Sequence, residues 1–366
     1  MNGSDERRRR TRRWQMPAAL VAALVVGGVI GGVIVAATTS SAATPSSSSA
    51  QVSACEVTSV ANQVLPSVVT ISVHGKGGSG TGSGEVIRSD GYILTNNHVI
   101  AAAASGGSVE VQFADGQTDP ATITGRDPLT DLAVIRVDTS GQLPVIAMGS
   151  SSSVVVGQAA VVIGAPLGLS GTVTSGIVSA LDRTIQVPGE NNSSALLVSA
   201  IQTDAPINPG NSGGAMVNCS GQLIGVPTAG ATVPSSSGES SGGSIGLGFA
   251  IPVDLAKTVS DEIIATGSVT HAFFGVGAVP IPTAAAAQAH VPEGLYVQSV
   301  VPGGPTAKAG LRQGDVITKI NGQPATSTVQ LQELTLTMKP GDTVPLEYWR
   351  SGQTATATVT LGTQPS

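Results

Sequence analysis

The 366-residue chain has few cysteines, few aromatic residues and few charges, and these shortages exclude several kinds of site. Its two cysteines, Cys55 and Cys219, form no C-x-x-C or Cys/His pattern, which excludes a metal site of that type. Aromatic residues make up 2% of the chain, so the cores must be built from Val, Ile, Leu and Ala. No Walker-type G-K-[ST] occurs, and a strand pattern, not the helix of a dinucleotide site, follows the G-x-G-x-x-G at residues 75–80. We expect no metal and no cofactor.

Basic residues are scarce outside the N-terminus. Six of the 17 Lys and Arg residues lie between Arg7 and Arg13. Without residues 1–37, the chain has 11 basic and 21 acidic residues, a formal charge near −10. A body this acidic lacks the clustered Lys and Arg side chains that contact phosphates. The sequence therefore excludes nucleic acid as a partner.

The N-terminal segment is typical of a membrane anchor. A basic segment, residues 1–15, precedes an uncharged apolar run, residues 16–37. At about 1.5 Å per residue this run spans a hydrocarbon core of roughly 30 Å. The positive-inside rule then keeps the basic segment in the cytoplasm and places the rest of the chain outside. The alternative is a cleaved signal peptide, whose apolar stretch is usually about 7–15 residues long.

A low-complexity linker, residues 38–54, is expected to connect the anchor to the folded body. Outside the cytoplasm the redox conditions permit a disulfide between Cys55 and Cys219. Two unpaired cysteines in the core are the alternative, because the sequence does not supply the geometry that a disulfide needs.

Residues 55–268 are expected to form a mainly β domain. Short apolar runs between turn signals form two series of about six strands each, which is typical of antiparallel barrels. The Gly- and Asn-rich segment 182–194 is interpreted as a loop. The first amphipathic helix, Asp254–Thr266, has Asp254 in the position of a cap and closes the domain.

Residues 273–362 are expected to form a second, α+β domain. Helical stretches are predicted near Thr306–Ala309 and Thr328–Thr337. Strands are predicted at Leu295–Val300, Asp315–Ile320, Thr343–Trp349 and Thr354–Leu361.

The candidate nucleophile is Ser212, in the string Gly210-Asn211-Ser212-Gly213-Gly214. Glycines permit the sharp turn that a nucleophilic serine needs and the close approach of a substrate carbonyl. The pattern G-x-S-x-G also describes the nucleophile elbow of α/β-hydrolases, which would need an acid and a histidine downstream, such as Asp254 and His271. A hairpin pattern follows Ser212 instead of the helix that an elbow requires.

Better partners lie upstream of the serine. His98 follows a predicted strand in Thr95-Asn96-Asn97-His98, and Asp131 precedes another apolar run. The order His, Asp, Ser is that of the chymotrypsin arrangement. Because a lone histidine is more often structural than catalytic, the agreement of all three contexts is what favours His98, Asp131 and Ser212 as a catalytic triad.

Several strings closely resemble the HtrA (high-temperature-requirement, DegP-like) serine proteases and the PDZ domain of that family. They are TNNHV (95–99), DPLTDLAVI (127–135), QTDAPINPGNSGG (202–214), GFAIP (248–252), FFGV (273–276) and VPGGPTAKAGLRQGDVITKING (301–322). The resemblance implies a chymotrypsin-like double antiparallel β-barrel followed by an α+β PDZ domain, in this chain preceded by one transmembrane helix. It also implies a serine endopeptidase of protein quality control and stress response that acts on unfolded or damaged proteins.

The resemblance assigns further roles. It places the oxyanion hole at the backbone N–H groups of Gly210 and Ser212. It places the specificity pocket beside Ile207, Thr228 and Ala229, whose character suggests small or medium aliphatic substrate side chains. In the PDZ domain it places the binding of a peptide's C-terminal carboxylate at the N–H groups of Phe274, Gly275 and Val276.

The chain departs from the family at its expected trimer contact. HtrA protease domains commonly form homotrimers through aromatic residues near the domain's start, but no aromatic residue occurs between Trp14 and Tyr92. A homotrimer would therefore need aliphatic contacts in their place. The rival functional interpretation is a latent protease that acts mainly as a chaperone or scaffold, and the intact triad argues against it.

Overall fold

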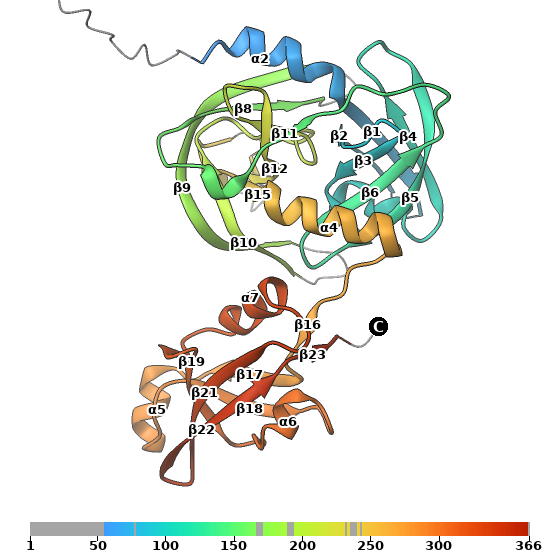
Figure 1. Ribbon diagram of the computed structural model, residues 1–366. Helices are drawn as coiled ribbons and strands as arrows, with labels where there is room; N and C mark the ends of the chain where they lie inside the picture. Colours follow the sequence, from blue (N-terminus) through green and yellow to red (C-terminus); the bar gives the residue numbers. More distant parts are fainter. Residues whose placement is uncertain are drawn as a thin grey trace, which may run out of the picture. The chain divides into compact units, whose positions relative to one another are not determined.

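The computed structural model describes residues 55–76, 78–165, 171–188, 194–230, 233–234, 240–241 and 244–364 (Figure 1). The expected anchor and linker, residues 1–54, lie outside this part of the chain. Within it, every helix is too short or too polar to cross a membrane.

The first barrel is a closed antiparallel sheet with the strand order β1-β2-β3-β6-β5-β4. Its strands are β1 (Val68–Gly75), β2 (Gly78–Val86), β3 (Tyr92–Thr95), β4 (Gly107–Gln112), β5 (Thr118–Asp127) and β6 (Leu132–Val137). Branched aliphatic side chains such as Ile71 and Ile93 fill its interior. They leave no room on the inner face of β2, where a Cβ at Gly84 would lie 2.7 Å from Ile93 and 2.8 Å from Ile71. Ser83 and Glu85 therefore face away from this core.

The second barrel is built on a sheet of order β11-β8-β9-β10-β15-β12-β7, which the additional pairing of β11 with β12 closes. Its strands are β7 (Ala147–Met148), β8 (Ala159–Gly164), β9 (Thr172–Pro188), β10 (Ser194–Thr203), β11 (Ala215–Val217), β12 (Gln222–Gly230) and β15 (Gly248–Pro252). The short pair β13 (Val233–Pro234) and β14 (Ser240–Ser241) stands apart. Two antiparallel barrels were predicted and are present. The predicted loop 182–194 is wrong for its first half, because β9 continues to Pro188 and pairs with β10 there.

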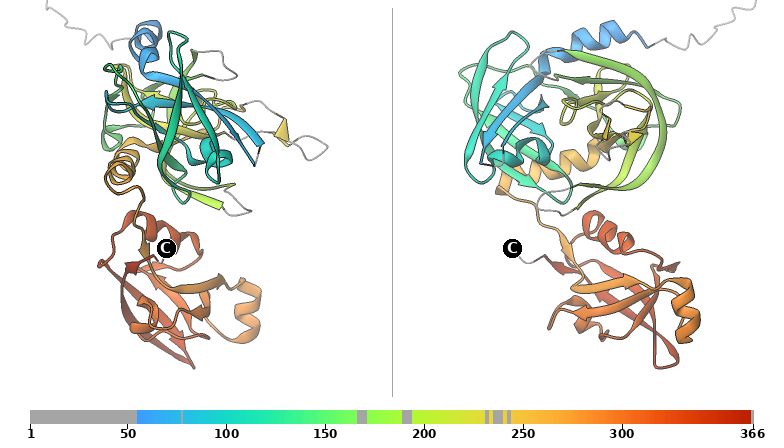
Figure 2. Two further views of the ribbon diagram at one scale, coloured as in Figure 1. Left: turned by 90° about the vertical axis from the view of Figure 1, so that its right-hand side faces the viewer. Right: turned by 180° about the vertical axis from the view of Figure 1, so that it is seen from behind.

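Helices and one disulfide connect the barrels. Helix α2 (Val57–Val64) is the blue helix beside the second barrel in Figure 2. Its Val60 and Val64 pack against residues of that barrel. Cys55, at the start of α2, forms a disulfide with Cys219 in the β11–β12 turn, with 5.1 Å between the two Cα atoms. Short helical turns lie at α3 (Asn97–Ile100), Leu65–Ser67, Ala101–Ala103 and Ser151–Ser153.

Helix α4 (Val253–Thr266) packs against strands of both barrels through a cluster that includes Leu94 of β3 and Ile251 of β15. The prediction that Asp254 caps it is wrong. Pro252 occupies the N-cap position, and Asp254 lies in the first turn. The Asp254 carboxylate instead accepts hydrogen bonds from the Ser150 hydroxyl and the Ser152 N–H.

The C-terminal module has a sheet of order β17-β18-β19-β21-β22 around an aliphatic core. Its strands are β16 (Ala272–Phe273), β17 (Val276–Pro280), β18 (Leu295–Val300), β19 (Val316–Ile320), β20 (Gln323–Pro324), β21 (Thr343–Arg350), β22 (Gln353–Thr360) and β23 (Gly362–Thr363). Its helices are α5 (Thr283–Ala289), α6 (Pro305–Lys308) and α7 (Val329–Thr337). The predicted strands and helices lie within one or two residues of these bounds. The sequence did not predict α5, β17 or the two-residue strands β16, β20 and β23.

Candidate active site

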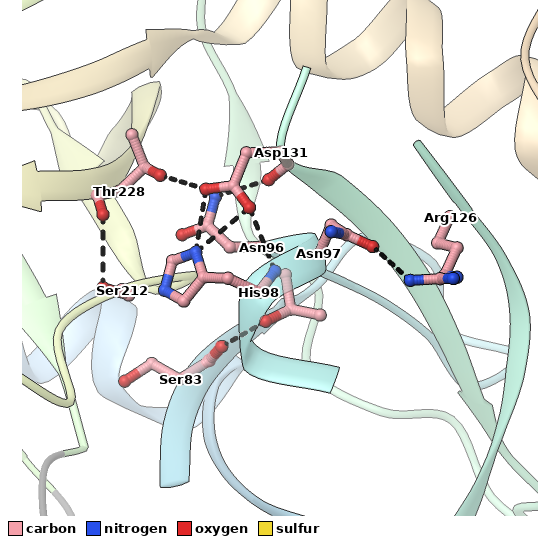
Figure 3. Close-up of polar contacts among 9 residues, drawn as sticks. Ser83, Asn96, Asn97, His98, Arg126, Asp131, Ser212 and Thr228 are labelled. Atoms are coloured by element: carbon pink, nitrogen blue, oxygen red, sulfur yellow. Dashed lines mark hydrogen bonds and ion pairs between the residues drawn. The ribbon is translucent and has the colours of Figure 1, made fainter. Parts of the chain in front are cut away.

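His98 and Asp131 form a hydrogen-bonded pair at one end of the first barrel (Figure 3). β3 ends at Thr95, and the short helix α3 then carries His98. The His98 Nδ1 atom lies 2.8 Å from Asp131 Oδ2 and 3.0 Å from Asp131 Oδ1. The backbone N–H of His98 also donates to Asp131 Oδ1 at 3.0 Å. These contacts orient the imidazole with Nδ1 toward the carboxylate and leave Nε2 for a second partner.

Asp131 is held by more donors than the imidazole alone. Its backbone has a left-handed conformation with φ of 57°, and its carbonyl accepts from the Asn97 N–H at 3.1 Å and from Asn96 Nδ2 at 2.8 Å. The Thr228 hydroxyl donates to its Oδ2 atom. A buried carboxylate is stable only when donors compensate its lost hydration. The surrounding groups therefore satisfy the buried Asp131 side chain with hydrogen bonds.

Ser212 lies in the loop that joins β10 to β11 in the second barrel. Its hydroxyl donates to the Thr228 carbonyl at 3.4 Å, and Figure 3 shows it on the far side of the His98 ring from Asp131. The loop requires glycine next to Ser212, because Gly213 has φ of 78° and a Cβ there would lie 2.4 Å from the Ser83 carbonyl oxygen. Gly210 also has a positive φ, of 99°.

A hollow of about 330 Å³ opens beside these residues. The first barrel contributes Thr81, His98 and Val99, and the second contributes Ile207, Asn208, Pro209, Gly210 and Ser212. His98 and Ser212 thus meet in a concave site between the barrels. Ile207 is buried and packs closely against Gly248, where an added Cβ would lie 2.6 Å from the Ile207 Cδ1 atom. The Ile207 side chain makes this part of the wall of the hollow aliphatic.

The side chains of Ile207 and Thr228, both expected at the specificity pocket, have different surroundings in the structure. Ile207 lines the hollow, whereas the Thr228 side chain is directed to Asp131. The Thr228 hydroxyl supports the Asp131 carboxylate, and the place of this residue beside the specificity pocket stays a prediction. Ala229 follows in β12, and its side chain lies outside the described part of the chain. Sequence reasoning missed this support, as it missed Asn96, although the string TNNHV placed Asn96 beside His98.

The downstream residues that a nucleophile elbow would need are engaged elsewhere. Asp254 is bonded to the serines before β8, and His271 Nε2 lies 2.9 Å from both carboxylate oxygens of Asp127. Among the described residues, no group of three or more His, Cys, Asp or Glu side chains is placed to hold a metal ion.

Glu85 is another buried carboxyl group of the first barrel. It faces away from the barrel core on the same side of β2 as Ser83. Burial raises the pKa of the Glu85 carboxyl well above its usual range, which favours the neutral acid.

In the C-terminal module, Phe274, Gly275 and Val276 line a hollow of about 230 Å³ that Leu331 and Thr335 of α7 also line. The Phe274 carbonyl accepts from the Thr306 N–H at 3.0 Å and hydroxyl at 2.7 Å, and the Gly275 carbonyl accepts from the Val301 N–H at 2.9 Å. In a trans peptide the N–H points opposite to the carbonyl. The N–H groups of Gly275 and Val276 are therefore directed away from Thr306 of α6 and from Val301.

Comparisons with known proteins identify the types of domain in the chain. A model of the trypsin-like peptidase domain matches residues 82–226, and a model of the PDZ domain matches residues 268–361. The serine protease PepD of Mycobacterium tuberculosis is 43% identical over 321 residues, which cover 86% of this chain and 68% of PepD. The periplasmic pH-dependent serine endoprotease DegQ of Escherichia coli is 40% identical over 291 residues, which cover 78% of this chain and 60% of DegQ.

Solved structures of proteases are also similar to this chain. The HtrA-type protease AlgW with a tripeptide superposes with a TM-score of 0.66 at 36% identity, over 85% of this chain and 98% of that one. The serine endoprotease from Yersinia pestis has a TM-score of 0.62 at 33% identity, over 84% of this chain and 98% of that one.

Proposed function

The chain belongs to the HtrA family of serine proteases, and we propose that it is a serine endopeptidase with His98, Asp131 and Ser212 as its triad. The observation that carries the proposal is the His98–Asp131 pair, which faces Ser212 across a concave site. Geometry of this kind matches the roles of base, orienting acid and nucleophile.

The mechanism follows from what each group can do. Ser212 Oγ attacks the substrate carbonyl while His98 Nε2 accepts its proton, and the proton then passes to the leaving amine. Asp131 holds the ring in the tautomer that leaves Nε2 free to accept, and it stabilises the imidazolium that forms. The N–H groups of Gly210 and Ser212 stabilise the oxyanion, an effect of about 3–4 kcal/mol per donor.

We propose unfolded or damaged proteins outside the cytoplasmic membrane as the substrates. An extended, unfolded segment can enter the hollow between the barrels, and the aliphatic Ile207 favours a small or medium apolar side chain there. The protease domain is assigned to residues 55–268 and the anchor to residues 16–37, which would keep the catalytic body beside the membrane.

The PDZ domain, residues 273–362, is proposed to regulate the protease by binding peptide C-termini. The carbonyls of Phe274 and Gly275 are already bonded within the module, which turns the N–H groups of Gly275 and Val276 away from those bonds. A peptide carboxylate beside them would receive two donors while its chain extends the sheet along β17.

The test is proteolysis by the full chain and by its Ser212→Ala variant. Both would be incubated with a permanently unfolded model protein, with and without added C-terminal peptides. Cleavage by the wild type, and none by the variant, is the expected result. Equal cleavage by the two proteins would contradict the proposal, as would intact substrate in every wild-type sample.

A further inference from the structure

Ser83 of β2 makes hydrogen bonds to both barrels through all its polar groups. Its N–H donates to the Ser212 carbonyl at 2.9 Å, and its hydroxyl donates to the Gly210 carbonyl at 2.6 Å. The hydroxyl also accepts from the Ala165 N–H at 2.8 Å. Its own carbonyl accepts from the Thr95 hydroxyl at 2.7 Å. Ser83 itself is 0% exposed, and its bonds with Thr95 and Ala165 are buried away from competing solvent.

The two carbonyls that Ser83 binds belong to the residues that would form the oxyanion hole. The segment 208–213 is called the oxyanion loop here. Gly210 and Gly213 both have positive φ, and glycine can leave such a conformation at little steric cost. A loop with this freedom needs outside contacts to hold its N–H groups toward a substrate. The Ser83 hydroxyl supplies one at Gly210, and the Ser83 N–H supplies one at Ser212.

The remaining bond of Ser83 reaches the other half of the site. Thr95, which donates to the Ser83 carbonyl, is the last residue of β3 and lies three positions before His98. Ser83 therefore links the strand that ends at His98 with the loop that carries Ser212. In Figure 3, Ser83 lies beneath His98, on the side of the ring away from Asp131.

We infer that Ser83 is a positioning residue, whose hydroxyl holds the oxyanion loop in register with His98 and with its N–H groups toward the substrate. This inference rests on the proposed endopeptidase function. Without the hydroxyl, the Gly210 carbonyl and the buried Ala165 N–H lose this partner, and the loop has to move or rotate to regain hydrogen bonds.

The test is the Ser83→Ala variant of the full chain, measured on a fluorogenic peptide and with a peptide boronic acid. We expect kcat to fall by about 10- to 100-fold, less than the roughly 10²- to 10³-fold loss of a whole oxyanion donor. KM should change by less than about twofold, because the hydroxyl is buried behind the loop. The boronic acid, whose adduct is tetrahedral, should lose affinity by the same factor as kcat.

Two further readouts separate positioning from general stability. The midpoint of the pH–rate profile should stay the same, because Ser83 does not contact the imidazole that sets it. Ser67→Ala is the matched control, since that serine is 3% exposed and donates to the Val64 carbonyl at 2.7 Å. It should lose comparable stability with no change in kcat. Ser83→Cys keeps a weaker donor, should give an intermediate kcat, and serves if Ser83→Ala does not fold.

A folded Ser83→Ala protein with the kcat and boronic acid affinity of Ser67→Ala would overturn the inference. An unchanged boronic acid affinity with a displaced pH midpoint would also overturn it. Failure of the proposed function has a different signature. The wild type itself would neither cut the peptide nor bind the boronic acid, and both proposals would fall together.

Discussion

Two of the buried carboxyl groups of the first barrel, Asp131 and Glu85, lie in opposite kinds of surroundings. Asp131 is 4% exposed and receives the His98 N–H, the His98 ring and the Thr228 hydroxyl. Glu85 is 0% exposed, and neither of its oxygens has a hydrogen-bond partner among the described residues. Burial is similar, but only the first group has the donors that a negative charge needs. Hydrogen-bond donors, rather than the extent of burial, therefore distinguish the surroundings of Asp131 from those of Glu85.

The largest effect should follow from removing the charge of Asp131. Asp131→Asn keeps the shape of the side chain but turns its amide toward His98, which selects the wrong tautomer, and kcat should fall on the order of 10⁴-fold. Steady-state kinetics on a peptide, together with a melting curve, would check this. Near-wild-type turnover in a folded variant would remove Asp131 from the triad.

A smaller effect should follow from removing one donor to Asp131. Thr228→Val replaces the hydroxyl with a methyl group and leaves the carboxylate with one partner fewer. Because a hydrogen bond to a charged group contributes about 1.5–3 kcal/mol, kcat should fall by about 10- to 100-fold. Thr228→Ser keeps the hydroxyl and is the control. If Thr228→Val were as active as Thr228→Ser, the hydroxyl would have no part in holding Asp131.

Replacing Glu85 with an apolar residue should stabilise the protein, in contrast to the losses of activity expected at Asp131 and Thr228. Glu85→Met removes two unpartnered oxygens from a buried position at similar volume, and the free energy of unfolding at pH 7 should rise by about 1–3 kcal/mol. Urea unfolding of both proteins measures the difference. A less stable variant would mean that the carboxyl is satisfied by a partner in solution.

The smallest expected effect is the pH dependence of the stability difference between the wild type and Glu85→Met. Burial raises the folded-state pKa of Glu85, so below the unfolded value of about 4.3 both states are protonated and the carboxyl has no linkage cost. As the pH rises above that value, only the unfolded state loses the proton, and the wild type loses stability. The advantage of Glu85→Met should therefore grow from pH 4 toward neutral pH. An advantage that shrinks over this range would contradict a raised pKa.

Local patterns predicted the fold better than they predicted the contacts of the site. The strand Leu295–Val300 was predicted with its observed bounds, because it is a short apolar run between turn residues. The second half of β9 was interpreted as a loop because polar residues alternate there with apolar ones such as Ile185 and Val187, which pack partly buried against the core. α5 was missed because its alanine run has little amphipathic pattern and buries only Ala286.

The missed site residues act through partners far away in the sequence. Ser83 contacts Gly210 across 127 positions, and Thr228 contacts Asp131 across 97. Nothing local distinguishes these hydroxyls from other small polar residues in strands. The same limit explains Asp254, whose place next to a helix start indicated a cap although its carboxylate bonds to serines about one hundred positions away.

The central claim is that Ser212 is a nucleophile activated by His98, and labelling with a fluorophosphonate tests it most directly. The full chain, its His98→Ala variant and its Ser212→Ala variant would be treated with the probe, and the adduct would be located by mass spectrometry. The account predicts an adduct on Ser212 in the wild type, a much slower reaction in His98→Ala and none at that position in Ser212→Ala. An adduct on another serine, or equal rates in the wild type and His98→Ala, would contradict it.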